Sequence, residues 1–163
     1  MKRNLVIAAI SIVLAVGIWA LFFRGSDDDR VRKTVRRAAD AVAVVPGENP
    51  VMRATRVRSE LLEVLAPEVS ASIPELGELG RGRDPLIGAG VAAAQAWQQA
   101  DIGVTFSRVQ IDDGKSAFVD LTATLTATRH GAASERDQRR CSLRLEKRDG
   151  TWRITEITVH GAT

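Results

Sequence analysis

The chain has no tyrosine, one cysteine and two histidines among its 163 residues. A single cysteine excludes an internal disulfide, and Cys141 alternates in phase with Leu143 and Leu145, which predicts a small buried apolar residue. His130 and His160 stand far apart, and no third ligand recurs near either of them. We therefore expect no metal site and no nucleophilic cysteine.

Nucleotide-binding motifs are also lacking. The glycine-rich stretch "PEVSASIPELGELGRGR" contains neither a GxxxxGK[ST] loop nor a GxGxxG fingerprint. The alternation at residues 69–73 predicts a short strand, and the glycines that follow predict a loop. We expect no bound cofactor.

An uncharged run opens the chain. Residues 4–23 read "NLVIAAISIVLAVGIWALFF", which as a helix spans about 30 Å, the thickness of one bilayer core. A cleaved signal peptide is the alternative, but the bulky end of the run and the lack of an A-x-A-like site favour an uncleaved anchor. We predict a short tail at residues 1–3, a transmembrane signal anchor at 4–23, a juxtamembrane linker at 24–29 and one domain at 27–160.

Apolar spacing predicts three helices in this domain. The first carries an apolar row from Val31 to Val45 and stops at Pro46, and the second spans 52–66. The third starts with Asp84 as its N-cap. Its expected buried side consists of Leu86, Ile87, Val91, Ala94 and Trp97.

After residue 101 the apolar period changes to two, which predicts four long strands joined as hairpins, the last through the turn at Asp149 and Gly150. The alternation slips by one residue between Phe106 and Val109, and again in the last strand at 154–157. Each slip predicts a β-bulge, and two bulged strands predict a strongly curved sheet that wraps around the helices.

This order of elements resembles the nuclear transport factor 2-like superfamily, which has a cystatin-like fold and includes SnoaL-like proteins. The stretches that carry the resemblance are "GRDPLIGAGVAAAQAW" and "EKRDGTWRITEITV". The resemblance implies an α+β fold, in which an N-terminal transmembrane helix precedes a cone-shaped domain of three helices packed on a curved antiparallel β-sheet. The superfamily includes isomerases, dehydratases, polyketide cyclases and many non-catalytic members, and the architecture looks most like its membrane-anchored bacterial group.

The resemblance also bears on location. Lys2 and Arg3 favour a cytoplasmic N-terminus, whereas the basic residues that follow the run argue for the opposite orientation. We expect a single-pass protein of the inner (cytoplasmic) membrane, with the C-terminal domain periplasmic or otherwise outside the cytoplasm.

Enzymes of the superfamily work inside the cone with a carboxylate or histidine base and often a tyrosine, which this chain lacks. Trp97, Asp101 and Trp152 are the candidates for lining a ligand pocket, and no residue is expected to be catalytic. The composition favours a non-catalytic, membrane-tethered binding or assembly module of the cell envelope. A small-molecule enzyme of the isomerase, dehydratase or hydrolase type, or a carrier of an apolar ligand, remains the alternative, and the polarity of the cone discriminates between them.

A basic face is expected on the first helix, opposite its apolar row. It consists of Arg30, Arg32, Lys33, Arg36 and Arg37. Because this face begins soon after the anchor, it is a candidate surface for anionic lipid or for an acidic partner. The expected partners are the membrane and either other envelope proteins or a second copy of the chain. Nucleic acid is disfavoured despite a sequence pI near 9.6, because basic and aromatic residues are not interleaved.

Overall fold

The computed structural model describes residues 26–74, 77–129 and 131–161. Its elements in chain order are α2 (Asp27–Val42), α3 (Pro50–Val64), β1 (Leu65–Ile73), β2 (Gly77–Leu79), α4 (Arg83–Ala96), β3 (Gln99–Asp112), β4 (Ser116–Thr128), β5 (Ser134–Arg148) and β6 (Thr151–Val159). No helix within these ranges is long and apolar enough to cross a membrane. The expected anchor at 4–23 lies outside the described residues.

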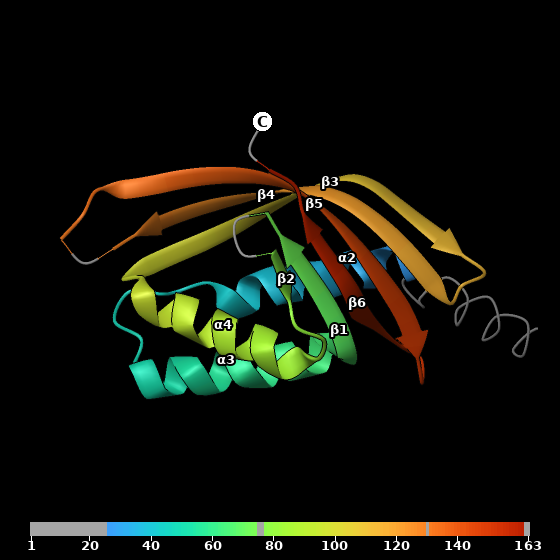
Figure 1. The fold of residues 1–163 in the computed structure, drawn as a ribbon, viewed down its shortest axis with the longest axis horizontal. Helices are drawn as coiled ribbons and strands as arrows, with labels where there is room; N and C mark the ends of the chain where they lie inside the picture. The colour runs from blue at the N-terminus through green and yellow to red at the C-terminus, as the bar shows by residue number, and fades with distance from the viewer. Residues whose placement is uncertain (1–25, 75–76, 130, 162–163) are drawn as a thin grey trace, which may run out of the picture.

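The helices all lie on one face of a curved sheet, and the long strands β3, β4 and β5 arch over α2 (Figure 1). The core lies between the two layers. It includes Val31 and Val35 of α2, Val57 and Leu61 of α3, Ile87 of α4, Val119 of β4, Leu145 of β5, and Trp152 and Ile154 of β6. The expected arrangement of three helices on a curved sheet is confirmed.

The sheet has the strand order β2-β1-β6-β5-β4-β3. Strands β3 to β6 pair as successive antiparallel neighbours, as expected. However, β1 runs parallel to β6, so the sheet is mixed, and the prediction of a purely antiparallel sheet was wrong. The pattern of successive hairpins could not reveal this pairing, because β1 and β6 lie far apart in the sequence and no short turn joins them.

Both predicted bulges are present. On β3, Phe106 pairs with Leu121 and Arg108 with Asp120, which leaves Ser107 as the extra residue. On β6, the register with β5 shifts between Ile154 and Glu156 in the same way. An extra residue in one strand bends the pair and increases its twist, which is consistent with the curvature of the sheet.

Some element boundaries differ from the sequence prediction. Helix α2 ends at Val42, because Val44 leaves the helix and forms a bridge with Ala100 of β3, its N–H donating to the Ala100 carbonyl at 2.7 Å. Val45, expected on the buried row, is 61% exposed as a result. The residue that caps α4 is Gly82, with a φ of 109°, whereas Asp84 lies in the first turn.

The region before α4 was also only partly predicted. Strand β1 begins at Leu65 rather than at 69, and the expected glycine-rich loop contains the short strand β2. Residues 71–73 of β1 pair with residues 77–79 of β2. Three residues are too few to give a recognisable alternation, so this strand left no signal in the sequence.

Candidate functional site

Buried apolar side chains lie between the helices and the concave face of the sheet. Ile87, Val119, Leu145 and Trp152 are each no more than 2% exposed. Among the described residues, Arg53 is the only buried side chain that is polar or charged. No described carboxylate or imidazole is therefore buried within the cone, where the enzymes of this fold type would need an acid or a base.

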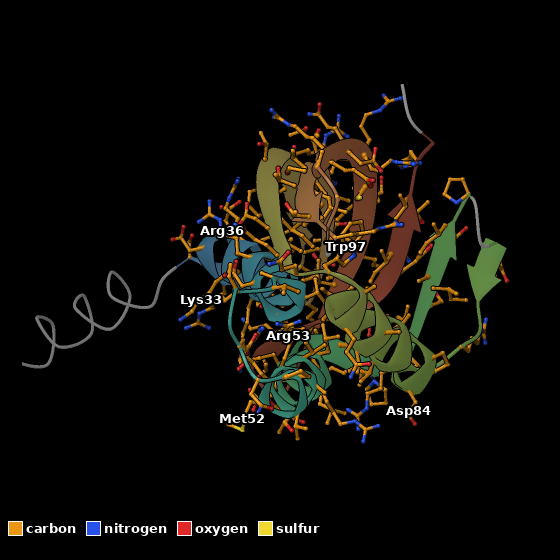
Figure 2. All side chains as sticks on the ribbon, turned by 90° about the vertical axis from the view of Figure 1, so that its left-hand side faces the viewer. Lys33, Arg36, Met52, Arg53, Asp84 and Trp97 are labelled. Atoms are coloured by element: carbon orange, nitrogen blue, oxygen red, sulfur yellow. The ribbon has the colours of Figure 1, made fainter. Side chains whose placement is uncertain are left out.

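The guanidinium of Arg53 is fully engaged in holding the helices together. It donates to the carbonyl oxygens of Ala94 and Trp97 at 3.0 and 3.3 Å, and to the carbonyl and carboxylate of Glu48 at 3.2 and 3.4 Å. A positive charge at the C-terminal end of α4 satisfies carbonyls that have no partner within the helix. Figure 2 shows Arg53 on α3 in the interior of the domain, between the other two helices.

A second arginine satisfies backbone carbonyls at the C-terminal end of α2. Arg56 donates to the carbonyls of Ala41 and Ala43, each at 2.9 Å, and to both carboxylate oxygens of Glu48, at 2.9 and 3.0 Å. These bonds from Arg56 are the main reason that the pKa of Glu48 is lowered. We call Glu48, Arg53 and Arg56 the Glu48 hub, since it joins the C-terminal ends of α2 and α4 to the start of α3.

Helical spacing could have revealed the hub. The buried residues of α3 are Arg53, Val57, Leu61 and Val64, which recur at intervals of three and four. Arg53 thus lies on the apolar side of its helix. A lone arginine in such a row indicates a buried guanidinium with several acceptors.

The sequence candidates Trp97 and Asp101 differ in their surroundings. Trp97 is half-buried, and the Arg129 guanidinium lies 4.6 Å from the centre of its ring. Asp101 is exposed, whereas its neighbour Ala100 is buried on the side of the helices. Because side chains alternate along a strand, Asp101 points away from the cone.

Trp152, the third candidate, is a core residue with one polar contact. Its Nε1 donates to Oδ1 of Asp27 at 3.3 Å, and Nζ of Lys147 donates to the same oxygen at 2.8 Å. The bond from Lys147 is the main reason that the pKa of Asp27 is lowered. Trp152 thus ties the start of α2 to the β5–β6 hairpin, and it also borders a hollow of about 210 Å³ between α2, α3 and this hairpin.

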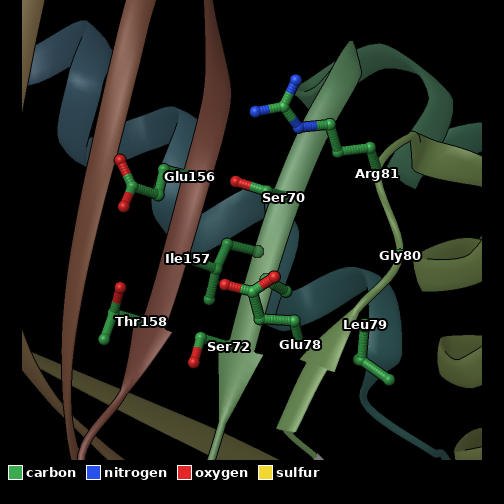
Figure 3. Close-up of a pocket in the computed structure, with 10 residues that line it drawn as sticks. Ser70, Ser72, Glu78, Leu79, Gly80, Arg81, Glu156, Ile157 and Thr158 are labelled. Atoms are coloured by element: carbon green, nitrogen blue, oxygen red, sulfur yellow. The ribbon is translucent and has the colours of Figure 1, made fainter.

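A small polar hollow lies where β1, β2 and β6 meet (Figure 3). It has a volume of about 160 Å³ and is lined in part by Ser70, Ser72, Glu78, Arg81, Glu156 and Thr158. The sequence carries no local signal for this hollow, because it depends on the parallel pairing of β1 with β6. Glu156 forms an ion pair with Arg144 of β5 at 3.8 Å. One of the acidic groups of the hollow therefore already has a partner within the sheet.

A short chain of hydrogen bonds crosses the outer face of the sheet. The hydroxyl of Ser142 donates to Oδ1 of Asp120 at 2.8 Å and lies 3.0 Å from Nε2 of His160. Since the single hydroxyl proton goes to Asp120, Nε2 of His160 must carry the proton of the second bond. Ser142 therefore has no imidazole base to activate it, and the arrangement differs from a nucleophile–base pair. His130 lies outside the described residues.

The basic face of α2 is smaller than the sequence predicts. Arg32 is paired with Asp28 at 2.6 Å, and Arg37 is paired with Glu60 and Glu63. Arg30 lies 4.0 Å from Asp27. These pairs follow from helical spacing and from the packing of α3 beside α2.

Lys33 and Arg36 are the remaining two members of that face. Both are exposed, and within the described part of the chain neither has an acidic partner. Figure 2 shows them on α2, well away from Arg53. They are the cations of this helix that are available to a ligand or partner.

The fold and its core define a cone-shaped α+β domain in which three helices pack on a curved mixed sheet. The family model for the SnoaL-like domain matches residues 52–159, and the chain belongs to this family. The matched segment runs from the start of α3 to the end of β6 and leaves out α2.

Solved structures agree with this assignment. A nuclear transport factor 2-like superfamily protein from Salmonella enterica has a TM-score of 0.67 and 14% identity, covering 85% of this chain and 92% of that one. A putative scytalone dehydratase from Novosphingobium aromaticivorans has a TM-score of 0.66 and 9% identity, covering 83% of each chain. A hexachlorocyclohexane dehydrochlorinase has a TM-score of 0.63 and 12% identity, covering 84% of this chain and 86% of that one.

None of the curated proteins compared with the chain matches it. At such low identities the likeness to solved structures establishes the fold alone, and an enzymatic or a ligand-binding role is compatible with it.

Proposed function

We propose that the chain is a non-catalytic binding or assembly module that is tethered to a membrane. The observation that carries the proposal is the apolar interior of the cone. Apolar side chains occupy the space in which a related enzyme would hold its substrate, and the buried guanidinium of Arg53 is used up by backbone carbonyls and Glu48. A binding role would then fall to the outer surfaces of the domain.

General acid–base chemistry needs a titratable group within hydrogen-bond reach of the reacting atoms, in a site from which water is largely excluded. Of the described residues, none with a carboxylate or an imidazole meets that condition inside the cone. The dehydratase and dehydrochlorinase activities named for two of the similar structures are therefore poor guides to this chain.

The tether is proposed from residues 4–23, whose length and lack of charge suit a single span. Only Arg24, Gly25 and Ser26 separate this run from the start of α2, so the domain would lie close to the lipid headgroups. Alkaline carbonate washing of membranes should leave the full-length chain in the pellet. A shorter, soluble species in the wash would instead identify the run as a cleaved signal.

Two sets of variants of the full-length chain test the module itself. A tagged chain would be purified from its native membranes in neutral detergent, and any protein that co-purifies in stoichiometric amount would be identified. Leu145→Met alters the inside of the cone at nearly constant volume, whereas Lys33→Glu with Arg36→Glu alters only the surface. We expect the cone variant to retain the partner and the surface variant to lose it. The opposite result, or a chain that purifies alone, would contradict an assembly role.

A further inference from the structure

We propose that the outer edge of β3, together with the exposed cations of α2, binds an acidic extended segment of a partner protein as an additional strand. The inference rests on the proposed function, because it names the chemistry of the partner that the module would hold. It uses backbone groups and charges that the fold itself leaves without partners.

The two edges of the sheet differ in length. Strand β2 forms one edge with three residues, Gly77–Leu79, whereas β3 forms the other with 14 residues, Gln99–Asp112. Short edge strands, charges and bulges are the usual protections against strand addition. Strand β2 is protected because it is short. Strand β3 is long, and its bulge at Ser107 protects only one part of it.

The direction of the free backbone groups can be read from one contact. Val44 and Ala100 exchange both backbone hydrogen bonds, at 2.7 and 3.1 Å, so Ala100 turns its N–H and C=O away from β4. Backbone direction alternates along an antiparallel strand, so Ile102, Val104 and Phe106 also turn theirs outward. Within the described ranges these three residues have no further backbone partner.

The free stretch has defined ends. The bridge to Val44 closes it at Ala100, and the bulge interrupts the regular alternation at Ser107. Residues 102–106 between them offer an edge of about 17 Å, long enough for about five residues of an added strand.

Two arginines of α2 stand beside this stretch. The guanidinium carbons of Arg32 and Arg36 lie 4.9 and 5.4 Å from the centre of the Phe106 ring. Arg32 is neutralised by Asp28, whereas Arg36 and the exposed Lys33 have no acidic partner in the part of the chain that the structure describes. An added strand with acidic side chains could therefore pair with the edge and approach free positive charge at the same time.

The charges also discriminate between occupants. A second copy of the chain paired edge to edge would add its own α2 cations to those already beside this edge, and like charges oppose association. An anionic lipid surface could satisfy Lys33 and Arg36, but lipid headgroups would not replace a strand along the backbone of residues 102–106. An acidic peptide satisfies both features.

The test uses the full-length chain in neutral detergent and a fluorescein-labelled peptide of about ten residues that alternates glutamate with valine and threonine. Binding is followed by fluorescence anisotropy. Lys33→Glu with Arg36→Glu should weaken binding about tenfold or more, because both charges are reversed. The matched control is Arg58→Glu with Arg81→Glu, the same change of charge at exposed positions away from β3, and it should leave the Kd within about twofold.

A backbone variant tests the strand pairing separately from the charge. Val104→Pro removes one outward N–H, and Gly103 before it relieves the steric restriction that proline places on its predecessor. We expect about tenfold weaker binding in a domain that still unfolds cooperatively in urea, at a somewhat lower midpoint because Val104 packs against the core. Should Val104→Pro unfold the domain, a peptide N-methylated at alternate residues gives the same test on the wild-type chain, and it should bind about tenfold more weakly than the parent peptide.

Charge-dependent binding that is indifferent to Val104→Pro and to N-methylation would overturn the proposal and leave an ordinary basic surface. Anionic liposomes that bind through Lys33 and Arg36, with no binding of the peptide, would assign the surface to lipid. The proposed function fails by a different result, which is the discovery of a small-molecule activity inside the cone. Such an activity would not change the peptide-binding measurements.

Discussion

Replacing Arg53 by methionine should destabilise the domain strongly. The change removes the guanidinium but keeps an unbranched apolar side chain in its place. Four hydrogen bonds are lost, to the carbonyls of Ala94, Trp97 and Glu48 and to the Glu48 carboxylate. The Arg53 side chain is only 9% exposed, so water can replace few of these bonds. Removing one partner of a buried charged pair costs about 3–5 kcal/mol, out of a total stability of about 5–15 kcal/mol.

The loss would be measured by urea unfolding, followed by far-ultraviolet circular dichroism. With a slope of about 2 kcal/mol per molar urea, the midpoint should fall by roughly 1.5–2.5 M. Arg58→Met is the matched control, because Arg58 is exposed on the same helix, and it should change stability by less than about 0.5 kcal/mol. A loss below about 1 kcal/mol for Arg53→Met would refute the reasoning that the Glu48 hub holds the helices together.

Three further perturbations test other parts of the structure. The pKa of Asp27 is lowered mainly by Lys147, so its contribution to stability is complete above the unfolded value of about 3.9 and is lost as the pH falls through the folded value. The Asp27→Asn variant should accordingly be less stable than wild type at pH 6. The difference should disappear at a pH low enough to protonate Asp27 in both the folded and the unfolded protein. A difference in stability that does not change with pH would exclude this linkage. Burial raises the pKa of the Cys141 thiol, so Ellman's reagent should modify the native chain at least about tenfold more slowly than the chain in urea, and equal rates would place the thiol at the surface. Truncation before Thr151 removes buried Trp152 and should abolish the cooperative thermal transition, and a truncated chain that still melts cooperatively would show that β6 is dispensable.

The sequence predicted the features that depend on local patterns. Three helices, four long hairpin strands and both bulges were visible because each leaves a periodicity, or a slip in a periodicity, within a few residues. The bulge at Ser107 is a clear case, since the apolar residues Phe106 and Val109 are separated by one residue too many.

Features that depend on pairing between distant segments were not visible. The parallel contact of β1 with β6, the bridge between Val44 and Ala100, and the short strand β2 each require a partner that the local pattern does not specify. The candidate site shows the same division. Trp152 was recognisable as an apolar residue of the last strand, but its contact with Asp27 depends on how α2 crosses the sheet.

The charges on α2 show why a sequence pattern overstates a binding surface. Helix α2 carries five basic residues, yet the fold pairs three of them with acids that are also part of the domain. Lys33 and Arg36 form no ion pair among the described residues, although Asp29 and Asp40 lie one helical turn from them. What is left is a small, directional patch of charge beside an unpaired strand edge, rather than a uniformly basic helix. Under the proposed function, binding falls to the outer surface of the domain, and this edge of the sheet offers backbone groups without partners beside positive charge.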